Sequence, residues 1–459
     1  MNLKFDLDKI KYSSSIKVRI KELLKLLEFY FLNGRPKYLK KCQQELTSFI
    51  PEIMNEMTFD ELMHIIPNYY QFCYTVTIEG GFLKNQIYIK KKLLLPFSKT
   101  VTKKLDSLDL QPLNYNTVDD NYLLICRHAV TKGMYAPGAA LYSISSGLLN
   151  LGKKIIIVSL GNVDKQFLNL MQKNSNLTIF NNKTTITAEK QLEHLRKICF
   201  SFKPSKVITE MPVNIATALY FSNISSKIIY WSPGFTQVPW FDKILLVPEL
   251  FNEDVFKSKK YIKVPQSLNI QLLNPKVDVS LINKYKKEYN IGPLDFVIGT
   301  FARYEKISVS FLKLVSNLLN NNKNRKIIIA GTNDNSIAKK MLKKFIENKQ
   351  ATILGFSDVH ILGNCCNIFL DTIPYPCGFS AIEIMAKGKP VVALNQENLD
   401  NYKKSRVDEL ILENESELNH IITKLENNIK FYDAMSEKSI EIAKKYDNTK
   451  ELAHRISLL

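Results

Sequence analysis

Two cations stand in a loop where they could hold a phosphorylated ligand. Arg303 and Lys306 follow a buried apolar segment and precede Ser308, which can cap a helix. A helix N-terminus beside two cations favours a bound phosphate, because the helix dipole and the free amide N–H groups act together. In a chain this rich in lysine, the same residues can also be solvated surface cations.

A second loop brings glycine, serine and glutamate to the start of another expected helix. Residues 371–390 have the pattern of a Pro/Gly loop, a helix, a glycine turn and a strand. Gly378 permits close approach of the backbone to a ligand, and a helix start at Ser380 offers N–H donors to an anion. Glu383 lies one turn further on, where a carboxylate can accept both hydrogen bonds of a ribose diol. The spacing of Ser380 and Glu383 also matches a capping box, so a structural role stays open.

A histidine follows an apolar segment earlier in the chain. Tyr122–Cys126 is succeeded directly by Arg127 and His128. The ordinary histidine pKa of about 6.5 suits proton abstraction near neutral pH, so His128 is a candidate general base. The alternative is a histidine held by backbone at a strand end, with Arg127 facing a phosphate. Glu210 follows another apolar segment and could act as an alternative base or orient an acceptor, although a helix cap is its simpler role.

Parallel sheets would bring these residues together. Apolar segments separated by helix-length amphipathic stretches indicate parallel strands whose faces are both covered. They form two sets, which predict two doubly wound domains, and ligands of such sheets bind beyond the carboxyl ends of the strands. The expected strands are residues 122–126, 154–159, 206–209, 227–231 and 244–247 in the first set, and 296–300, 326–330, 351–354, 368–370 and 390–394 in the second.

The segment before these strands is mainly helical in pattern. A helix is expected from Ser13 to Leu32, and Thr58–Glu61 is a capping box that opens another. Residues 88–95 could be strand or helix. We therefore predict an α/β protein with three units: a helical N-terminal domain over residues 1–115, and Rossmann-like domains over residues 116–275 and 276–459.

Composition excludes several classes of protein. The 459 residues are 45% hydrophobic and 23% charged, which is typical of globular proteins. The net charge of +19 could attract nucleic acid, an anionic membrane face or a phosphorylated substrate, but a compositional bias toward lysine, asparagine and isoleucine explains it equally well. The apolar runs are far shorter than the ~20 residues of a membrane span, and the first residues lack an apolar signal region. We expect a cytoplasmic protein whose seven cysteines are reduced and bind no metal.

Together these loops resemble the nucleotide-sugar domain of GT-B glycosyltransferases. Within that fold, the chain is similar to the O-linked N-acetylglucosamine transferase family and to the bacterial cytoplasmic N-glucosyltransferases that modify adhesins. The resemblance extends from about residue 120 to residue 459. It rests on Arg303-x-x-Lys306, Phe369–Thr372, Gly378–Pro390 and, upstream, Ser226–Thr236 and Val264–Gln266.

The resemblance implies roles for individual residues. By it, Lys306 binds the donor diphosphate and Glu383 the ribose, while His360 lies near the position of a histidine beside the uracil. Tyr375 stands where the larger retaining class carries the first of two glutamates, which favours an inverting enzyme. The expected catalytic residues are His128 and Lys306, and the expected donor-binding residues are Arg303, Lys306, Gly331, Phe356, His360, Asp371, Gly378, Phe379, Ser380 and Glu383.

The function implied is inverting, metal-independent transfer of a sugar from a UDP-sugar to a polypeptide acceptor in the cytoplasm. No cofactor is expected, because cations and dipoles of the protein can stabilise the leaving diphosphate. One alternative is a transferase of lipid-linked or capsular polysaccharide synthesis, docked on a membrane through its positive charge. Another is a non-catalytic GT-B subunit that recognises an acceptor. A nucleic-acid partner is not expected, since the chain shows no recognised binding module.

Overall fold

The computed structural model describes most of the chain after residue 50. The described residues are 22, 50–51, 53–77, 89–131, 136–171, 174–182, 186–211, 213–231, 238–247, 253–303, 306–331, 336–374, 376–395 and 403–459. Tyr375 and residues 232–236, to which the sequence analysis assigned meaning, lie outside this set.

The first sheet is entirely parallel and has the strand order β3-β2-β1-β4-β5-β6-β7. All five strands expected here are confirmed to within a few residues. Strands β3 and β7 lie at the two edges and were not predicted, because edge strands with exposed faces lack the continuous apolar run that identifies a buried strand. The strands are β1 (Val118–Cys126), β2 (Lys154–Ser159), β3 (Leu177–Asn181), β4 (Pro204–Thr209), β5 (Lys227–Trp231), β6 (Lys243–Leu246) and β7 (Tyr261–Lys263).

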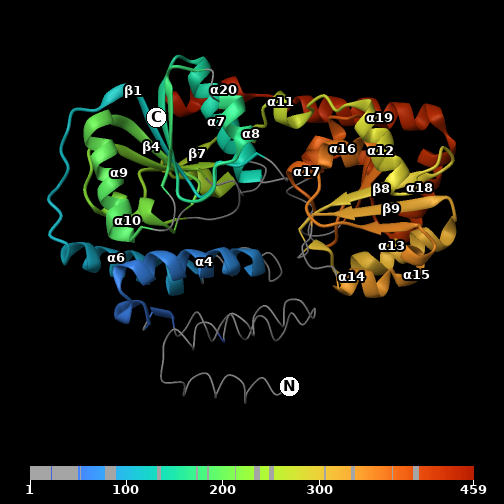
Figure 1. Cartoon of the computed structure of the whole chain (residues 1–459), viewed down its shortest axis with the longest axis horizontal. Coiled ribbons are helices and arrows are strands. Elements are labelled where there is room, and N and C mark those ends of the chain that lie inside the picture. Colours follow the sequence, from blue (N-terminus) through green and yellow to red (C-terminus); the bar gives the residue numbers. More distant parts are fainter. Residues whose placement is uncertain are drawn as a thin grey trace.

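The second sheet is also parallel, in the order β10-β9-β8-β11-β12-β13, and the two sheets lie side by side in Figure 1. Its five expected strands are confirmed, and only the two-residue β13 was not foreseen. The strands are β8 (Phe296–Phe301), β9 (Arg325–Ala330), β10 (Ala351–Ile353), β11 (Ile368–Leu370), β12 (Val391–Leu394) and β13 (Ile411–Leu412).

Helices cover both faces of each sheet. Those beside the first sheet are α7 (Ala136–Asn150), α8 (Lys165–Met171), α9 (Ala188–Phe202) and α10 (Ile215–Phe221). Beyond the short α11 (Ile270–Leu273), the second sheet carries α12 (Val279–Glu288), α13 (Val309–Asn321), α14 (Ser336–Met341), α15 (Lys343–Glu347), α16 (Val359–Cys365), α17 (Phe379–Met385), α18 (Glu415–Asn427) and α19 (Ile429–Lys444).

Strand β1 shows why the strands have continuous apolar runs. Leu123 and Ile125 enter one hydrophobic core, whereas Leu124 and Cys126 enter the core on the opposite face. Successive side chains of a strand point to opposite faces, so a sheet covered on both sides needs apolar residues at every position. The α/β class, with two Rossmann-like domains, is confirmed.

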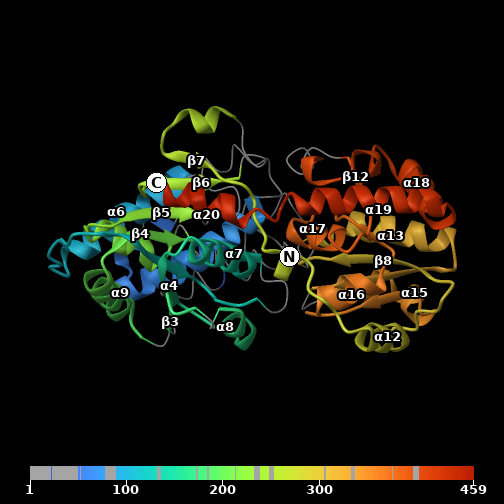
Figure 2. The ribbon, with the colours of Figure 1, turned by 90° about the horizontal axis from the view of Figure 1, so that it is seen from above.

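The last helix returns to the first sheet. Helix α20 (Thr449–Ser457) packs on α7, and Figure 2 shows it lying over the first domain. A Cβ added to Gly147 would lie 2.6 Å from the Thr449 carbonyl oxygen, so the two helices can approach this closely only because residue 147 is glycine. Arg455 also donates to the Lys263 carbonyl of β7 at 3.0 Å. The chain therefore crosses from the second domain back to the first at its end.

Helices of the N-terminal region pack against the first domain. The capping box is confirmed: Glu61 N–H donates to Thr58 Oγ1 and Thr58 N–H to Glu61 Oε2, opening α4 (Phe59–Thr77). Residues 90–94 form a π-helical turn that leads into α6 (Leu95–Asp106), so the described part of this ambiguous segment, residues 89–95, is helical. Helices α4 and α6 contact α9 and α10 and share one core with them. The helix expected from Ser13 to Leu32 lies outside the described residues, apart from Glu22.

None of the described helices is both long enough and apolar enough to cross a membrane.

Candidate functional site

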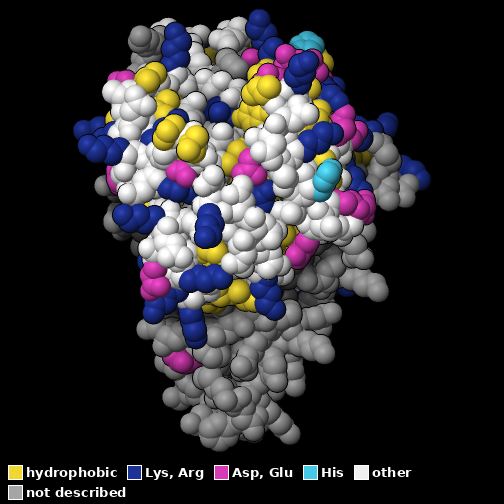
Figure 3. Space-filling model, turned by 90° about the vertical axis from the view of Figure 1, so that its right-hand side faces the viewer, with side chains coloured by type: hydrophobic (Ala, Val, Ile, Leu, Met, Phe, Trp, Pro, Cys, Tyr) yellow, Lys and Arg dark blue, Asp and Glu magenta, His cyan; other side chains and the backbone are white. Residues whose placement is uncertain are grey.

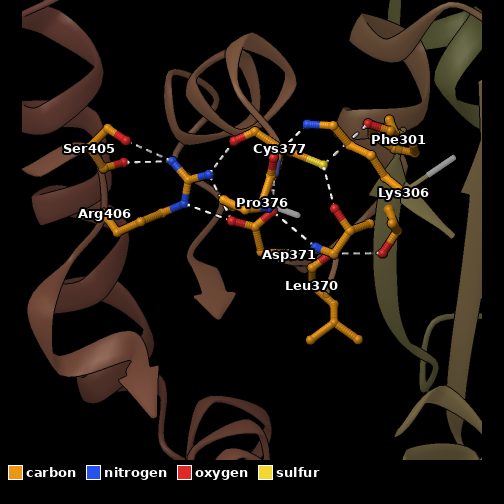
Figure 4. Close-up of polar contacts among 10 residues, drawn as sticks. Phe301, Lys306, Leu370, Asp371, Pro376, Cys377, Ser405 and Arg406 are labelled. Atoms are coloured by element: carbon orange, nitrogen blue, oxygen red, sulfur yellow. Dashed lines mark hydrogen bonds and ion pairs between the residues drawn. The ribbon is translucent and has the colours of Figure 1, made fainter. Parts of the chain in front are cut away.

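A buried ion pair holds the loop after β11 (Figure 4). The Arg406 guanidinium donates to Asp371 Oδ2 from Nε at 3.0 Å and from Nη2 at 2.7 Å, and both side chains are excluded from solvent. Asp371 Oδ1 accepts the backbone N–H of Thr372 at 3.0 Å and of Cys377 at 2.6 Å. Arg406 also donates to the Cys377 carbonyl. These contacts occupy both carboxylate oxygens, so Asp371, expected to bind the donor, anchors the loop instead.

Lys306 lies in the loop after β8, the strand beside β11, and contacts that same loop. Its Nζ donates to the Pro376 carbonyl at 2.5 Å, as Figure 4 shows. Burial lowers the pKa of Lys306, and Cys377 and Asp371 partly oppose that effect. Ser308 caps α13 as expected and donates to the Ile373 carbonyl at 2.5 Å. The two loops predicted to bind phosphate are thus joined, whereas Arg303 is exposed at their edge.

The start of α17 differs from the expected capping box. The helix begins at Phe379, with Gly378 as N-cap and no side-chain cap, so Ser380 and Glu383 do not form the box. The Glu383 side chain is buried, and no described residue donates a hydrogen bond to its carboxylate. Burial raises the pKa of Glu383 to about 7, with Lys387 opposing the shift and Asp358 adding to it. A Cβ added to Gly378 would meet no atom within 4 Å, so the backbone here borders open space.

His360 lies on α16, the helix packed against α17. Asp358 caps α16 by accepting the His360 backbone N–H at 2.8 Å. The ring Nδ1 of His360 is buried, and no residue in the described part of the chain forms a hydrogen bond with it. Burial, followed by the nearby Lys387 ammonium, lowers the pKa of His360 to about 4. The imidazole is therefore neutral at pH 7, close to the lysine that also acts on Glu383.

The other predicted donor residues have different surroundings. Gly331 directly follows β9 and has φ +99°, a backbone conformation that favours glycine. A Cβ at this position would lie 3.0 Å from the carbonyl oxygen of Ala302, the residue that follows β8, so glycine is required here. Phe356 is 61% exposed in the loop after β10. Phe379 packs against the cores of both domains, as does Ala139 of α7. Phe379 thus lies where the two domains touch.

His128 lies at the carboxyl end of β1, as expected, but its ring is held by backbone. Its Nδ1 accepts the Asn162 N–H at 2.9 Å, and a Cβ added to Gly161 would lie 2.4 Å from that nitrogen. Burial, with the neighbouring Arg127, lowers the pKa of His128. A neutral imidazole whose Nδ1 accepts a hydrogen bond carries its proton on Nε2. Both nitrogens are then committed, which makes His128 poorly suited to accept a proton.

Glu210 follows β4, the strand beside β1. Its Oε1 accepts the Arg127 N–H at 2.9 Å, whereas Oε2 is buried and has no hydrogen-bond partner among the described residues. Burial raises the pKa of Glu210 to about 7, and the contacts with Arg127 oppose this only in part. The helix-cap interpretation is wrong, because Asn214 caps α10 by accepting the Ala216 N–H at 2.7 Å.

Three residues near these sites were not found from the sequence. Arg406 pairs with an aspartate 35 positions earlier, and no local pattern predicts such a partner. Asn68 of α4 accepts from Arg127 Nη2 at 3.4 Å. Lys387 donates to Asn274 Oδ1 at 3.1 Å, which ties the turn after α17 to the segment between the domains. Within the described part of the chain, no group of three or more His, Cys, Asp or Glu residues could hold a metal ion.

Comparisons with known proteins agree with this architecture. Residues 283–442 match the family model described as Glycosyl transferases group 1. No curated protein sequence matches the chain.

Several solved structures share the fold. A mutant O-GlcNAc transferase from Thermobaculum terrenum has a TM-score of 0.54 at 11% identity, covering 99% of this chain and 95% of its own. A glycosyltransferase from Rickettsia africae has a TM-score of 0.56 at 14% identity, covering 74% and 97%. HepE from Anabaena, in complex with UDP and glucose, has a TM-score of 0.55 at 13% identity, covering 73% and 98%.

At such identities the structural likeness establishes the fold, and the family model adds the class of the second domain. The chain is a glycosyltransferase with the GT-B fold, and its second Rossmann-like domain contains a glycosyl transferase group 1 domain.

Proposed function

We propose that the chain transfers a sugar from a UDP-sugar to a polypeptide acceptor, with inversion and without a metal. The observation that carries the proposal is Glu383, a buried carboxylate with no hydrogen-bond donor among the described residues. It lies on α17, whose N-cap Gly378 borders open space. A site that leaves a carboxylate unpaired beside such space suits a ligand with hydroxyl donors, and a ribose diol provides two.

Lys306 would neutralise the leaving diphosphate. Its contact with Pro376 holds the ammonium at the loop that precedes Gly378, and Arg303 adds a second, exposed cation nearby. Preorganised positive charge stabilises the negative charge that develops on a leaving group, so the proposed reaction requires no metal. Neutral His360, with its unpaired Nδ1, can hydrogen-bond the base of the nucleotide. The UDP bound by HepE supports this choice of nucleotide.

The polypeptide acceptor rests on likeness to the O-GlcNAc transferase, whose structure covers nearly the whole chain. A second candidate is glycosyl transfer to a lipid-linked acceptor. Two findings favour it: the net charge of +19, and the similarity to WaaG, a glycosyltransferase involved in lipopolysaccharide biosynthesis (TM-score 0.51). On the face seen in Figure 3, Lys and Arg side chains are scattered among Asp and Glu. We therefore rank the membrane-docked acceptor second.

The donor site is tested by calorimetric titration with UDP. Wild-type protein is expected to bind, and Lys306→Ala and Glu383→Ala should each weaken binding about 10- to 100-fold, the effect of losing a charge-assisted hydrogen bond. Lys438→Ala is the matched control, because it removes a cation from an exposed ion pair with Glu409 on another part of the surface. A folded wild-type protein that does not bind UDP would contradict the proposed donor, and other nucleotides would then be titrated.

The transfer itself is tested with UDP-glucose and UDP-N-acetylglucosamine. Mass spectrometry of polypeptides incubated with the protein and a UDP-sugar detects transfer to a polypeptide. Flotation of the protein with anionic vesicles detects the membrane binding that a lipid-linked acceptor requires. Proton NMR of the product then reports its anomeric configuration: an inverted product is expected, and a retained one would contradict inversion.

A further inference from the structure

We propose that Lys387 is a positioning residue that couples donor binding at Glu383 to the segment joining the two domains. This inference rests on the proposed function, because it takes Glu383 to bind the ribose of the donor. It assigns a role to a side chain that the sequence analysis did not select. Lys387 lies just beyond the C-terminal end of α17, whereas Gly378 is the N-cap at the other end of that helix.

Lys387 and the joining segment, residues 264–278 between β7 and α12, are hydrogen-bonded in both directions. The Lys387 ammonium Nζ donates to Asn274 Oδ1 at 3.1 Å and lies 3.5 Å from the Leu273 carbonyl oxygen. The Asn274 side-chain amide donates back to the Ala386 carbonyl at 2.9 Å. The same ammonium donates to the Glu383 carbonyl at 3.3 Å, one turn earlier on α17. Lys387 therefore contacts both the joining segment and the residue proposed to bind the donor.

A glycine of α16 leaves the space in which the Lys387 side chain lies. A Cβ added to Gly363 would lie 3.1 Å from Lys387 Cδ and 2.4 Å from Ile384 Cδ1. The aliphatic part of Lys387 thus packs against α16, and the side chain is half-buried. Long cationic side chains commonly bury their stem and leave the head at a polar partner. Here the stem is held by packing, and the ammonium is directed to Asn274.

The joining segment is also attached to the first domain. The Asn269 N–H donates to Ser143 Oγ of α7 at 2.9 Å, and Asn269 Nδ2 donates to Ser146 Oγ at 3.3 Å. The short helix α11 lies between Asn269 and Asn274. At Lys387, the helix that carries Glu383 therefore holds a segment that is anchored on the other domain.

Charge connects the two sides of this contact. Burial raises the pKa of Glu383 and lowers the pKa of Lys387, and each charge opposes the shift of the other. Asp358 and His360 of α16 also interact with this pair through their charges. Ribose hydroxyls that donate to the Glu383 carboxylate favour its ionised form. Ionised Glu383 in turn favours protonated Lys387, which is a stronger hydrogen-bond donor to Asn274 than the neutral amine.

Such coupling is reciprocal. If donor binding strengthens the contact between Lys387 and the joining segment, that contact raises the affinity for the donor by the same factor. Asn274 is exposed, and its side chain is hydrogen-bonded to Lys387 and Ala386, neither of which is proposed to bind the donor. Substitution of Asn274 therefore tests the coupling and leaves the donor site itself unaltered.

The test is calorimetric titration of the full chain with UDP. Asn274→Ala should weaken UDP binding about 3- to 10-fold. Lys387→Met keeps the aliphatic stem on Gly363 and should weaken binding at least as much. The double variant should bind no more weakly than Lys387→Met, because both changes break one contact. Asn269→Ala is the matched control, since its contacts are with the first domain, and its UDP affinity should stay within about twofold of wild type.

Infrared difference spectra give a second readout, which a merely structural role would not change. A protonated carboxyl band is assigned to Glu383 by its absence from Glu383→Gln. At pH 7 this band should shrink when UDP binds to the wild type, because the ribose favours the ionised form. The band of the unliganded protein should be larger in Asn274→Ala than in wild type, because Lys387 is then less firmly held in its protonated state.

Three outcomes would overturn the inference: unchanged UDP affinity in Asn274→Ala, losses that add fully in the double variant, or equal carboxyl bands in unliganded Asn274→Ala and wild type. Wild-type protein that does not bind UDP would instead contradict the proposed function. A Glu383→Ala variant that loses UDP affinity beside an Asn274→Ala variant that keeps it would support the donor site and refute the coupling.

Discussion

Two buried carboxylates, one in each domain, differ in how many hydrogen bonds they accept. Asp371 follows β11 and Glu210 follows β4, so each stands at the carboxyl end of an apolar strand. Asp371 accepts four hydrogen bonds, two of them from the buried Arg406 guanidinium. From the residues that the structure describes, Glu210 accepts one hydrogen bond, donated by a backbone amide, and its second oxygen accepts none. The partners of a buried carboxylate therefore decide how firmly it holds the loop around it, even where the sequence context is alike.

Replacing Arg406, the cation that pairs with Asp371, should have the largest effect on the stability of the fold. Arg406→Met leaves Asp371 buried without its counter-charge, and breaking a buried ion pair in this way costs about 3–5 kcal/mol. The midpoint of thermal unfolding, followed by circular dichroism, should fall clearly. Lys438→Met is the matched control, because the exposed pair of Lys438 with Glu409 should contribute less than about 1 kcal/mol. Similar losses in both variants would show that burial does not distinguish the two pairs.

Replacing Glu210 with a neutral residue should raise the stability of the fold, the opposite of the Arg406 substitution. The folded-state pKa of about 7 lies above the ordinary value of 4.5, so the folded protein binds more protons than the unfolded chain between these values. Wild-type stability therefore falls as pH rises through that window. Glu210→Gln cannot ionise, and above pH 7 it should be more stable than wild type by up to about 3 kcal/mol. The gain should be absent at pH 4.5. Unfolding midpoints that show no dependence on pH in this comparison would contradict the raised pKa.

Substituting two glycines of the second domain should affect either the stability of the fold or the binding of UDP, depending on the glycine. Gly331→Ala introduces a side chain at φ +99° and 3.0 Å from a backbone oxygen, and should cost about 1–3 kcal/mol. Gly378→Ala meets no atom within 4 Å, so its unfolding midpoint should stay close to that of wild type while UDP affinity falls. The pair is measured by thermal unfolding and UDP titration. A Gly378→Ala variant that binds UDP as wild type does would place the ligand elsewhere.

The smallest effect concerns the contact between the helical region and the first domain. Asn68→Ala removes the acceptor of the Arg127 guanidinium, an exposed contact of 3.4 Å, and should cost less than about 1 kcal/mol. If the helical region positions Arg127 for the transfer, the rate of UDP release from a UDP-sugar should change more than the unfolding midpoint. Equal, negligible changes in both would show that α4 only covers the sheet.

Local pattern was sufficient for much of the fold. The apolar strands, the capping box at Thr58 and the cap of α13 at Ser308 depend on neighbouring residues, and all three are confirmed. The position of Lys306 in the fold was predictable because its loop follows a buried strand and precedes a capped helix, whereas its role as a donor-binding residue stays a prediction. Edge strands β3 and β7 were missed because one-sided burial leaves no continuous apolar signal.

The roles of the polar residues follow from contacts that form only in the folded chain. The sequence alone predicts two parallel sheets and the loops that follow their strands. It did not determine that Arg406 and the Thr372 and Cys377 amides together occupy both oxygens of Asp371. Nor did it determine that the Asn162 N–H, 34 positions away, donates to His128 Nδ1. It also could not show that α17 begins before Ser380, so that Ser380 and Glu383 do not form a capping box. The spacing of hydrophobic residues is a property of neighbouring positions in the sequence. The burial of a polar side chain and its hydrogen-bond partners depend instead on segments that meet only when the chain folds.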